Sequence, residues 1–447
     1  MCHPTTTHLF DYSVMFISIP DLYNRFKECS GVSTDTRKIV PSCLFVALRG
    51  DNFDGNRFAQ KALEAGAKYA LVDDPEVATD PRFLLVKDSL SALQALAVLH
   101  RQTLKIPVVG LTGSNGKTTT KELLAAVLSK KFRTYATRGN FNNHIGVPLT
   151  VLAIDATYEI AVIEMGANHQ REIELLSAIC QPTHGLITNV GKAHLEGFGG
   201  LEGVRKGKGE LYDYLAQSGG TVFVNAQDQT LAAMHGERTF KETIFYLGDT
   251  ASPFPRAELI ADSPSILYKT PYGTTVRAHL AGRYNFENIA AALCVGQYFG
   301  VDARAADDAV AAYDPDNNRS QVIEKGTNTI ILDAYNANPS SMAVAIESFI
   351  KRPAPRKMVI LGDMLELGTD APSEHLALGQ LVATGGFDVV ILAGKLMADA
   401  LPALPKAYYF TDKFSLHNWI SDNPQANTHV LIKGSRGMSL ETVVPFL

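Results

Sequence analysis

VVGLTGSNGKTTT, residues 108–120, is the strongest local signal in the sequence. Its apolar start predicts a buried strand over residues 108–112, and the segment 117–131 predicts a helix. The glycine-rich turn between them is of the kind whose backbone N–H groups face an anion at a helix N-terminus. In such a turn Lys117 reaches the terminal phosphates and Thr118 holds Mg²⁺. The stretch therefore predicts a nucleotide-binding α/β domain.

The turn departs from the general P-loop spacing at one position. That spacing places the first glycine at 111, where this chain has Leu111, and Gly110 and Gly113 flank the position instead. The alternative is an accidental strand-turn-helix that contains Gly-Lys-Thr. An apolar strand before the turn and a helix-forming segment after it favour the phosphate-binding interpretation.

Strands and helices alternate on both sides of this turn. The pattern predicts further central strands at residues 159–163, 185–190 and 221–225, followed by a helix at 287–299. Such alternation is typical of a largely parallel sheet with both faces covered. The N-terminal part has strands at 43–48 and 69–72 and helices at 59–66 and 89–104, and the C-terminal part has strands at 329–333, 357–361, 389–393 and 429–432.

Two breaks divide the chain. They are Ile106-Pro107 and the turn-rich stretch Tyr313–Asn318. We therefore expect an α/β protein of three domains: a small N-terminal α/β domain over residues 1–105, a central P-loop ATPase domain with a mostly parallel sheet over 106–314, and a C-terminal Rossmann-like doubly wound domain over 315–447. Residues 1–14 have little pattern, and we expect either a disordered lead or a start at Met15.

Composition excludes several classes of protein. The 447 residues carry 41 Lys plus Arg against 46 Asp plus Glu, a net charge of −5, so no basic field indicates nucleic acid or an anionic membrane surface. No apolar run reaches the ~18 residues of a membrane helix. The five cysteines are odd in number and widely spaced, which fits neither a disulfide framework nor a metal knuckle. We expect a cytoplasmic protein.

Polar residues follow several predicted strands. Glu164 ends one strand, where a carboxylate faces the ligand crevice of an open α/β sheet, and His194 follows another by a short loop. Taken singly, such a Glu is more often a cap or an ion-pair partner, such a His more often lies at the surface, and Mg²⁺ prefers oxygen ligands to imidazole. Similar clusters follow other strands: Gly139–Asn143, Asp333–Pro339, Gly362–Gly368 and Lys433–Arg436. A turn explains each cluster alone, but their shared position favours a ligand site.

These stretches together resemble the Mur ligases, the ATP-dependent amino-acid and peptide ligases of peptidoglycan precursor synthesis. The motifs that carry the resemblance run from about residue 17 to 447 in the family's order. They are STDTRKIVPSCLFVALRGDNFDGNRF (33–58), TGSNGKTTT (112–120), GNFNNHIGVPLT (139–150), EMGANHQREI (164–173), ITNVGKAHLEGFG (187–199), DAYNANPSSM (333–342) and LGDMLELG (361–368). TGSNGKTTT is similar to the family's own P-loop variant, which accounts for the missing first glycine.

The resemblance implies a role for each matching residue. The ATP phosphates are wrapped by Gly113, Ser114, Asn115, Gly116, Lys117, Thr118 and Thr119. Two Mg²⁺ ions are implied, one held by Thr118 and Glu164 and the second with the help of His194. Lys208 matches a lysine that family members carry as a carbamate, an anionic oxygen ligand; otherwise it is a solvated helix charge like Lys206. The remaining implied contacts are Asn288 near the adenine, Arg319 and Asp333 at the nucleotide, Asn142 or Asn143 at the reacting groups, Thr36 and Arg37 at the UDP-sugar end, and Asn336 and Asn338 at the substrate.

The implied reaction is the ATP-dependent addition of D-alanyl-D-alanine to UDP-N-acetylmuramoyl-tripeptide through an acyl phosphate. The third residue of the tripeptide stays open between diaminopimelate and lysine, and we expect a monomer with no nucleic-acid or membrane partner. Alternatives are another ligase of the family, a folylpolyglutamate synthase-like ligase or, from a different class, a P-loop kinase or nucleotide switch. Asn56, Ser42-Cys43 and Ala334 depart from the commoner residues at their positions.

Overall fold

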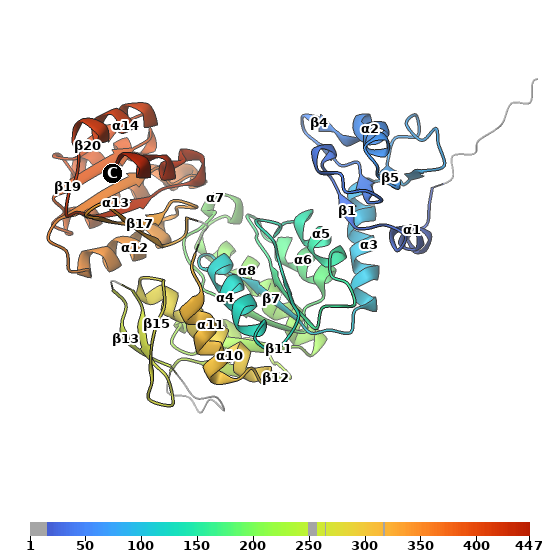
Figure 1. The fold of residues 1–447 in the computed structure, drawn as a ribbon, viewed down its shortest axis with the longest axis horizontal. Coiled ribbons are helices and arrows are strands. Elements are labelled where there is room, and N and C mark those ends of the chain that lie inside the picture. Colours follow the sequence, from blue (N-terminus) through green and yellow to red (C-terminus); the bar gives the residue numbers. More distant parts are fainter. Residues whose placement is uncertain (1–15, 249–256, 264, 316–317) are drawn as a thin grey trace, which may run out of the picture. The chain divides into compact units, whose positions relative to one another are not determined.

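The computed structural model describes residues 16–248, 257–263, 265–315 and 318–447 (Figure 1). The expectations for residues 1–14 and for a start at Met15 lie outside the described residues. The chain forms two compact units. The first contains the residues up to 105 together with 138–156 and 178–181, and the second contains the remainder. The three-domain boundaries at 105 and 314 stay a prediction.

The first unit contains a sheet of four parallel strands in the order β1-β2-β5-β6 (Val32–Ser33, Leu44–Val46, Tyr69–Val72, Phe83–Leu85). Its helices are α1 (Ile19–Phe26), α2 (Ala59–Glu64), α3 (Ser89–Thr103) and α5 (Gly146–Leu152). Phe45, Ala70 and Leu85 are buried between strands and helices. The predicted strands and helices of this region are present, with ends that differ by up to two residues.

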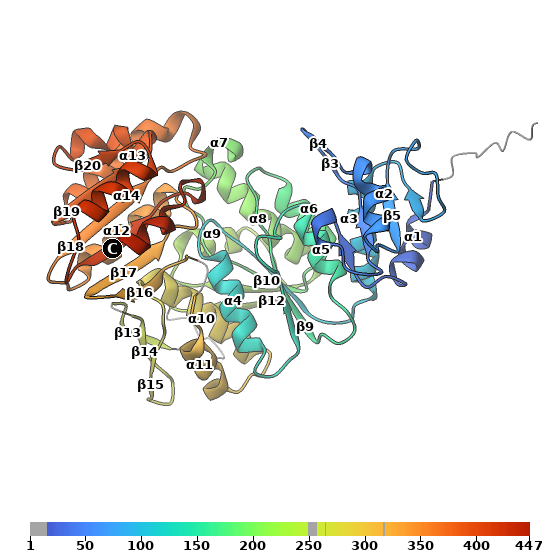
Figure 2. The same ribbon diagram turned by 45° about the horizontal axis from the view of Figure 1, so that its top comes forward.

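The second unit contains a central sheet of six parallel strands, in the order β12-β11-β10-β7-β9-β8 (Figures 1 and 2). The strands are Glu242–Tyr246, Thr221–Asn225, His184–Ile187, Val108–Thr112, Ile160–Glu164 and Thr134–Ala136. Strand β7 lies between β10 and β9, and all five of its residues are buried. The loops that follow these three strands therefore meet at one edge of the sheet, as expected for parallel neighbours.

Helices lie between and after the strands of this sheet along the chain. They are α4 (Lys117–Leu128), α6 (Glu172–Cys180), α7 (Leu195–Phe198), α8 (Leu201–Ser218), α9 (Gln229–Gly236), α10 (Arg283–Tyr298) and α11 (Ala303–Ala312). Helix α4, which follows the glycine-rich turn, packs on α10 and α11. Leu123, Leu124 and Val127 of α4 are fully buried in the same core as Ala292 and Val295 of α10. This core holds α4 in place, and α4 is the helix that follows the glycine-rich turn.

A small antiparallel sheet was not predicted from the sequence. It consists of β13 (Glu258–Ala261), β14 (Leu267–Lys269) and β15 (Thr275–Arg277). Its strands are too short for a clear period-two pattern. The buried Tyr268 hydroxyl donates to Asp307 Oδ1 at 2.7 Å and so ties β14 to α11.

The C-terminal part forms a mixed sheet in the order β16-β17-β21-β18-β19-β20. The strands are Gln321–Lys325, Asn328–Asp333, His429–Lys433, Lys357–Gly362, Val389–Ala393 and Tyr408–Phe410. β16 alone of these runs antiparallel to its neighbour. Helices α12 (Pro339–Lys351), α13 (Ala371–Ala383) and α14 (Lys413–Asp422) accompany it. The predicted doubly wound domain is confirmed, with an antiparallel edge that the sequence did not reveal.

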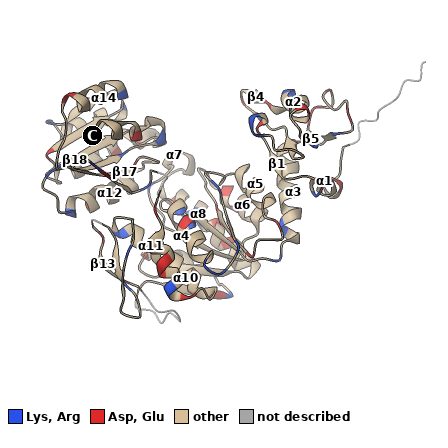
Figure 3. Ribbon diagram, in the orientation of Figure 1, with Lys and Arg blue, Asp and Glu red and all other residues tan. Residues whose placement is uncertain are grey.

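Two general expectations bear on function. Acidic and basic residues both occur along the ribbon (Figure 3), and the net charge of the chain is −5. Within the part of the chain that the structure describes, no helix is both long and apolar enough to span a bilayer.

The contact between α4 and α10 gives a test of this architecture. A Cβ at Gly296 would lie 2.4 Å from Val127 Cγ1, so Gly296→Val overpacks the core behind the nucleotide loop. We expect it to lower the free energy of unfolding by about 1–3 kcal/mol in urea titrations. Gly236→Ala is the matched control, because Gly236 ends α9 with no atom near its Cβ position, and it should be neutral or slightly stabilising. Equal effects of the two substitutions would contradict the packing argument.

Candidate functional site

The turn between β7 and α4 is shaped by two glycines with positive φ. Gly113 has φ 149°, and a Cβ there would lie 1.9 Å from Thr188 Oγ1. Gly116 has φ 78°, and a Cβ there would lie 2.7 Å from Asn288 Oδ1. Both positions therefore need glycine for conformation and for space. The missing glycine at 111 matters less, because Leu111 is still part of the buried strand.

The loop after β10 holds this turn in place. Ser114 N donates to Asn189 O and Asn115 N to Asn189 Oδ1, both at 3.0 Å. The Thr188 hydroxyl donates to Asn115 O at 2.6 Å. Ser114 Oγ bonds to both the carbonyl and the N–H of Gly191. Asn189 was not singled out from the sequence, although its place just after a strand of the sheet could have identified it.

Lys117 lies folded into the turn. Its Nζ donates to Gly113 O at 2.6 Å and to Ser114 O at 3.1 Å. Burial lowers the pKa of Lys117 to about 8, Glu164 opposes this shift, and Arg319 adds to it. The ammonium therefore lies where positive charge is uncompensated, as expected for a site that receives a polyanion.

Thr118 and Glu164 lie together at the edge of the sheet. The Thr118 hydroxyl donates to Glu164 Oε1 at 3.3 Å, and both residues are buried. Glu164 is the last residue of β9, beside β7. A hydroxyl next to a carboxylate offers the oxygen ligands that Mg²⁺ prefers. Among the described residues, no group of three or more His, Cys, Asp and Glu could hold a metal alone. The pair therefore fits a cation that takes its other ligands from phosphate and water.

Lys208 lies inside helix α8 with only 1% of its surface exposed. Its Nζ donates to Ala167 O at 3.1 Å and lies 5.0 Å from the centre of the Phe198 ring. No carboxylate of the described residues lies within ion-pair distance of it. Burial and the charge of Lys117 lower the pKa of Lys208 well below its usual value, against opposition from Glu172 and Glu210. The surface alternative for Lys208 is therefore wrong, since a solvated charge would be exposed like Lys206.

His194 precedes α7 and is one of the few non-glycine residues with positive φ, at 53°. Burial lowers the pKa of His194, Lys117 and Lys208 add to the shift, and Glu366 opposes it. A neutral imidazole is the form that binds metal ions. Burial and the two lysines therefore favour the neutral imidazole of His194, which is the form that a metal ion requires.

Asn288 lies in α10 behind the turn. Its Oδ1 accepts from the Thr120 hydroxyl at 3.0 Å and its Nδ2 donates to Asn285 Oδ1 at 3.1 Å. The side chain is 5% exposed. These contacts place Asn288 against Gly116, on the floor of the turn.

The C-terminal sheet contributes a second set of predicted residues. The guanidinium carbon of Arg319 lies 3.7 Å from the centre of the Tyr335 ring, and that of Arg436 lies 4.8 Å from it. Asp333 Oδ2 accepts from Lys433 Nζ at 2.6 Å, and Asp333 Oδ1 accepts from Ser320 N at 3.2 Å. The strand register explains the contact between Asp333 and Lys433, because the two residues lie opposite each other on the neighbouring strands β17 and β21.

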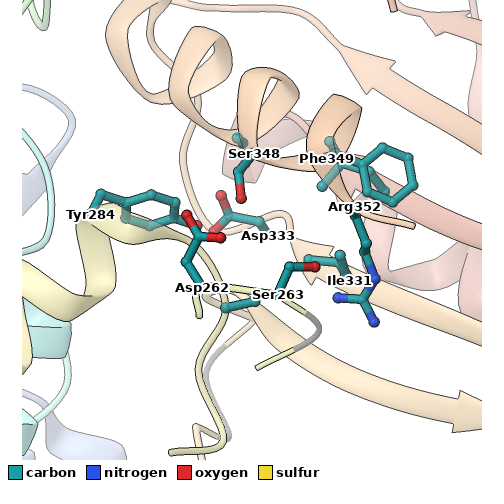
Figure 4. A pocket seen from close by; sticks show the side chains of 11 residues that line it. Asp262, Ser263, Tyr284, Ile331, Asp333, Ser348, Phe349 and Arg352 are labelled. Atoms are coloured by element: carbon teal, nitrogen blue, oxygen red, sulfur yellow. The ribbon is translucent and has the colours of Figure 1, made fainter. Parts of the chain in front are cut away.

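Asp333 also lines a small, partly open pocket (Figure 4). Tyr284 lies on one side of it, and Phe349 and Arg352 lie on the other. The Tyr284 hydroxyl bonds to Ser320 Oγ at 2.7 Å, next to Arg319. Tyr284 and Ser320 were not singled out from the sequence, and Lys433 was singled out without its partner Asp333, because only the fold brings these residues together.

The segment after β17 reaches the phosphate turn. Asn338 caps α12, and its Nδ2 donates to Asn115 Oδ1 at 2.8 Å. The Ser340 hydroxyl accepts from Lys192 N at 2.8 Å. Asn336 lies at the base of this segment, where its carbonyl accepts from Lys433 Nζ. Two stretches more than 200 residues apart in sequence therefore meet at the turn.

Four predicted residues lie in the first unit. Arg37 Nε and Nη2 form a two-point ion pair with Asp35, and Thr36 begins the same short 3₁₀ helix. Asn143 Oδ1 accepts from Ile145 N and Gly146 N, at the start of α5. Asn142 precedes it in the exposed loop. The two bonds that Asn143 Oδ1 accepts support the interpretation of Asn143 as a turn-forming residue. Asn56, one of the departures noted above, is buried and donates to Asp54 and Asp73.

The position of Lys117 predicts a pH dependence. Its pKa falls from 10.5 in water to about 8 in the folded protein, so the unfolded chain holds more protons between these values. The free energy of unfolding of the nucleotide-free protein should therefore gain a rising contribution from about pH 8 to pH 10.5. Urea unfolding of the protein and of Lys117→Met across this range isolates that contribution from tyrosine titration. Parallel curves for the two proteins would contradict it.

Comparison with known proteins places this geometry in a family. Three family models match: the Mur ligase family catalytic domain at residues 28–109, the Mur ligase middle domain at 111–296, and the Mur ligase glutamate ligase domain at 318–436. The UDP-N-acetylmuramoyl-tripeptide--D-alanyl-D-alanine ligase of Bacillus subtilis is 36% identical over 426 residues, covering 93% of this chain and 92% of the relative.

Solved structures are similar to this chain over most of its length. The crystal structure I of MurF from Acinetobacter baumannii has a TM-score of 0.82 and 30% identity, and covers 96% of this chain and 98% of that one. MurF ligase from Thermotoga maritima in complex with ADP has a TM-score of 0.81 and 28% identity, with coverage of 95% and 97%. The chain therefore belongs to the Mur ligase family.

Proposed function

We propose that this protein is the ATP-dependent ligase that adds D-alanyl-D-alanine to UDP-N-acetylmuramoyl-tripeptide. The products are UDP-N-acetylmuramoyl-pentapeptide, ADP and phosphate, in peptidoglycan precursor synthesis. The observation that carries the substrate assignment is the 36% identity to the Bacillus subtilis ligase of that name across 93% of the chain. The reaction type is supported by the phosphate turn with Lys117, beside the buried pair Thr118 and Glu164.

The chemistry proceeds in two steps. The terminal carboxylate of the tripeptide attacks the γ-phosphorus of ATP, which gives an acyl phosphate and ADP. The amine of D-alanyl-D-alanine then attacks the acyl carbon, and the tetrahedral intermediate loses a proton and expels phosphate. Two bulky anions must first be brought together, so positioning by the protein supplies much of the rate.

The residues of the turn act on the first step. The backbone N–H groups at the start of α4 bind the phosphates, aided by the positive end of the helix. Lys117 must leave its contacts with Gly113 O and Ser114 O to reach the terminal phosphate. There its charge offsets the negative charge that develops on the transferring group. When the nucleotide binds, phosphate oxygens would replace the two carbonyl oxygens as hydrogen-bond acceptors of the Lys117 ammonium.

Two divalent cations complete the proposed site. Thr118 and Glu164 would hold the first, and His194 and a carbamate on Lys208 would hold the second. Mg²⁺ supplies charge neutralisation and orientation of phosphoryl oxygens. The lowered pKa of Lys208 supports the carbamate, because the neutral amine is the form that adds CO₂. Lys208 is also buried and forms no ion pair with a carboxylate of the described residues, so its side chain is not committed to another charged partner.

The other predicted residues have proposed roles in binding. Asn288 lies on the floor of the turn and would approach the adenine side of the nucleotide, and Arg319 and Asp333 would contact the nucleotide from the C-terminal sheet. Asn336 and Asn338 would bind substrate near the turn. In the first unit, Thr36 and Arg37 would bind the UDP end, and Asn142 or Asn143 the reacting groups. We propose that the protein is a monomer in the cytoplasm, where ATP is available and thiols stay reduced.

The reaction is tested by its dependence on both acceptors. We expect ADP formation with UDP-tripeptide to rise strongly on addition of D-alanyl-D-alanine, with one pentapeptide per ADP in a coupled assay and mass spectrometry. Lys117→Ala should lower kcat/KM by about 10²-fold or more, since it removes charge that stabilises the transition state. Phosphate release that ignores both the UDP-peptide and the dipeptide would instead indicate a kinase or nucleotide switch.

The carbamate has a separate test. Protein equilibrated with ¹³C-bicarbonate should give a carbamate ¹³C NMR signal that is absent from Lys208→Arg. Lys206→Arg is the matched control, because Lys206 lies two residues earlier on the same helix and is exposed to solvent. A signal that survives Lys208→Arg, or none in the parent protein, would contradict the modification.

A further inference from the structure

Glu366 contacts His194 from the C-terminal part of the chain. Its Oε2 forms a hydrogen bond with His194 Nδ1. Glu366 follows β18 in the motif Gly362–Gly368, whereas His194 follows β10 of the central sheet. None of the roles assigned above uses Glu366, although its carboxylate makes the direct side-chain contact to a proposed cation ligand.

The backbone on both sides is set for this contact. Glu366 has φ 63° and His194 has φ 53°, a left-handed conformation that non-glycine residues rarely adopt. The Glu366 side chain is 58% exposed and that of His194 22% exposed. Packing does not force an exposed glutamate into this geometry. The pair is therefore a feature that the two loops are built to present.

The contact determines the chemistry of the imidazole. A carboxylate accepts but does not donate, so Nδ1 carries the proton and Nε2 carries the lone pair. Histidines that bind metal ions characteristically donate their second N–H to a carboxylate or carbonyl, which fixes the tautomer and the ring direction. The His194–Glu366 pair has this arrangement, with Nε2 left to face a cation.

We propose that Glu366 is a positioning residue for the second divalent cation: it holds His194 in the tautomer and orientation that present Nε2 as a ligand. This inference rests on the proposed second cation site. Glu366 lies in the loop after β18 of the C-terminal sheet, whereas His194 lies in a loop of the central sheet. The C-terminal part of the chain therefore orients a proposed cation ligand of the central part. Cation binding and the docking of the Gly362–Gly368 loop are then coupled, so each strengthens the other.

A neighbouring ion pair supplies a matched control. Lys192 Nζ lies 2.6 Å from Glu374 Oε1, so this pair also joins the loop after β10 to the C-terminal part, at α13. Loss of Glu374 removes a contact between the same two regions without touching His194. Comparing Glu366→Ala with Glu374→Ala separates orientation of His194 from general weakening of the docking.

The experiment measures Mn²⁺ binding to the full chain by EPR in the presence of a non-hydrolysable ATP analogue and UDP-tripeptide. We expect two bound ions, the weaker one showing ¹⁴N coupling in pulsed EPR that His194→Ala removes. Glu366→Ala should weaken this ion 10- to 100-fold and diminish the ¹⁴N coupling, and leave the tighter ion unchanged. Glu366→Gln, which keeps an acceptor oxygen, should retain more affinity than Glu366→Ala, and Glu374→Ala should leave the coupling intact.

The outcomes separate this inference from the proposed function. Two ions with ¹⁴N coupling in the parent protein, unchanged or tightened in Glu366→Ala, would overturn the positioning role alone. An equal loss in Glu374→Ala would also overturn it, because docking would then explain the effect. A single bound ion or no ¹⁴N coupling in the parent protein would overturn the second cation site itself. Circular dichroism of each variant checks that the fold is retained.

Discussion

The close approach of two loops at Gly113 is the constraint on which the rest of the site depends. Thr188 Oγ1 occupies the space that a side chain at 113 would need, and it donates from there to Asn115 O. The loop after β10 thereby holds the turn after β7 in a fixed shape. The same loop continues to Lys192 and His194, so one close contact sets both the phosphate turn and the proposed second cation ligand.

Buried positive charge is the second organising feature. Arg319 acts on Lys117 and Lys117 acts on Lys208, and the pKa values of both lysines are lowered although nearby glutamates oppose the shifts. Such an arrangement costs stability in the absence of ligand. A bound nucleoside triphosphate would offset the positive charge around Lys117. A carbamate would change the charge of Lys208 from positive to negative. These buried lysines support the proposed binding of ligands that carry several negative charges, although the chain as a whole is mildly acidic.

The C-terminal sheet takes part through side chains at its own strand ends. Asn338 reaches Asn115, Ser340 reaches Lys192, and Glu366 reaches His194. Each of these residues follows a parallel strand, where polar groups gather at one edge. Loops of two sheets therefore meet at the residues proposed for the ATP site. In the proposed function, the loops of the C-terminal sheet would supply orientation as well as substrate contacts.

Much of this could be predicted from residues 108–120 and the strands around them. The buried strand, the turn and the start of α4 at Lys117 agree with the structure, because apolar runs, glycines and good helix formers act locally. The sheet of β13, β14 and β15 was missed, since its strands of three or four residues carry no clear periodicity. The Tyr335 stack on Arg319 and Arg436 and the Asp333–Lys433 pair were also missed, because their partners are far apart in sequence.

The sequence by itself determined the elements, the phosphate-binding turn and the family, because each depends on residue type and spacing within a short segment. Only the tertiary structure decided the state of the individual groups. Lys208 and Lys206 are alike in sequence, yet α8 buries one and exposes the other. His194 and Glu366 are 172 residues apart, and only the folded sheets bring them together. Burial and long-range contact set pKa values and tautomers, and neither can be obtained from local sequence.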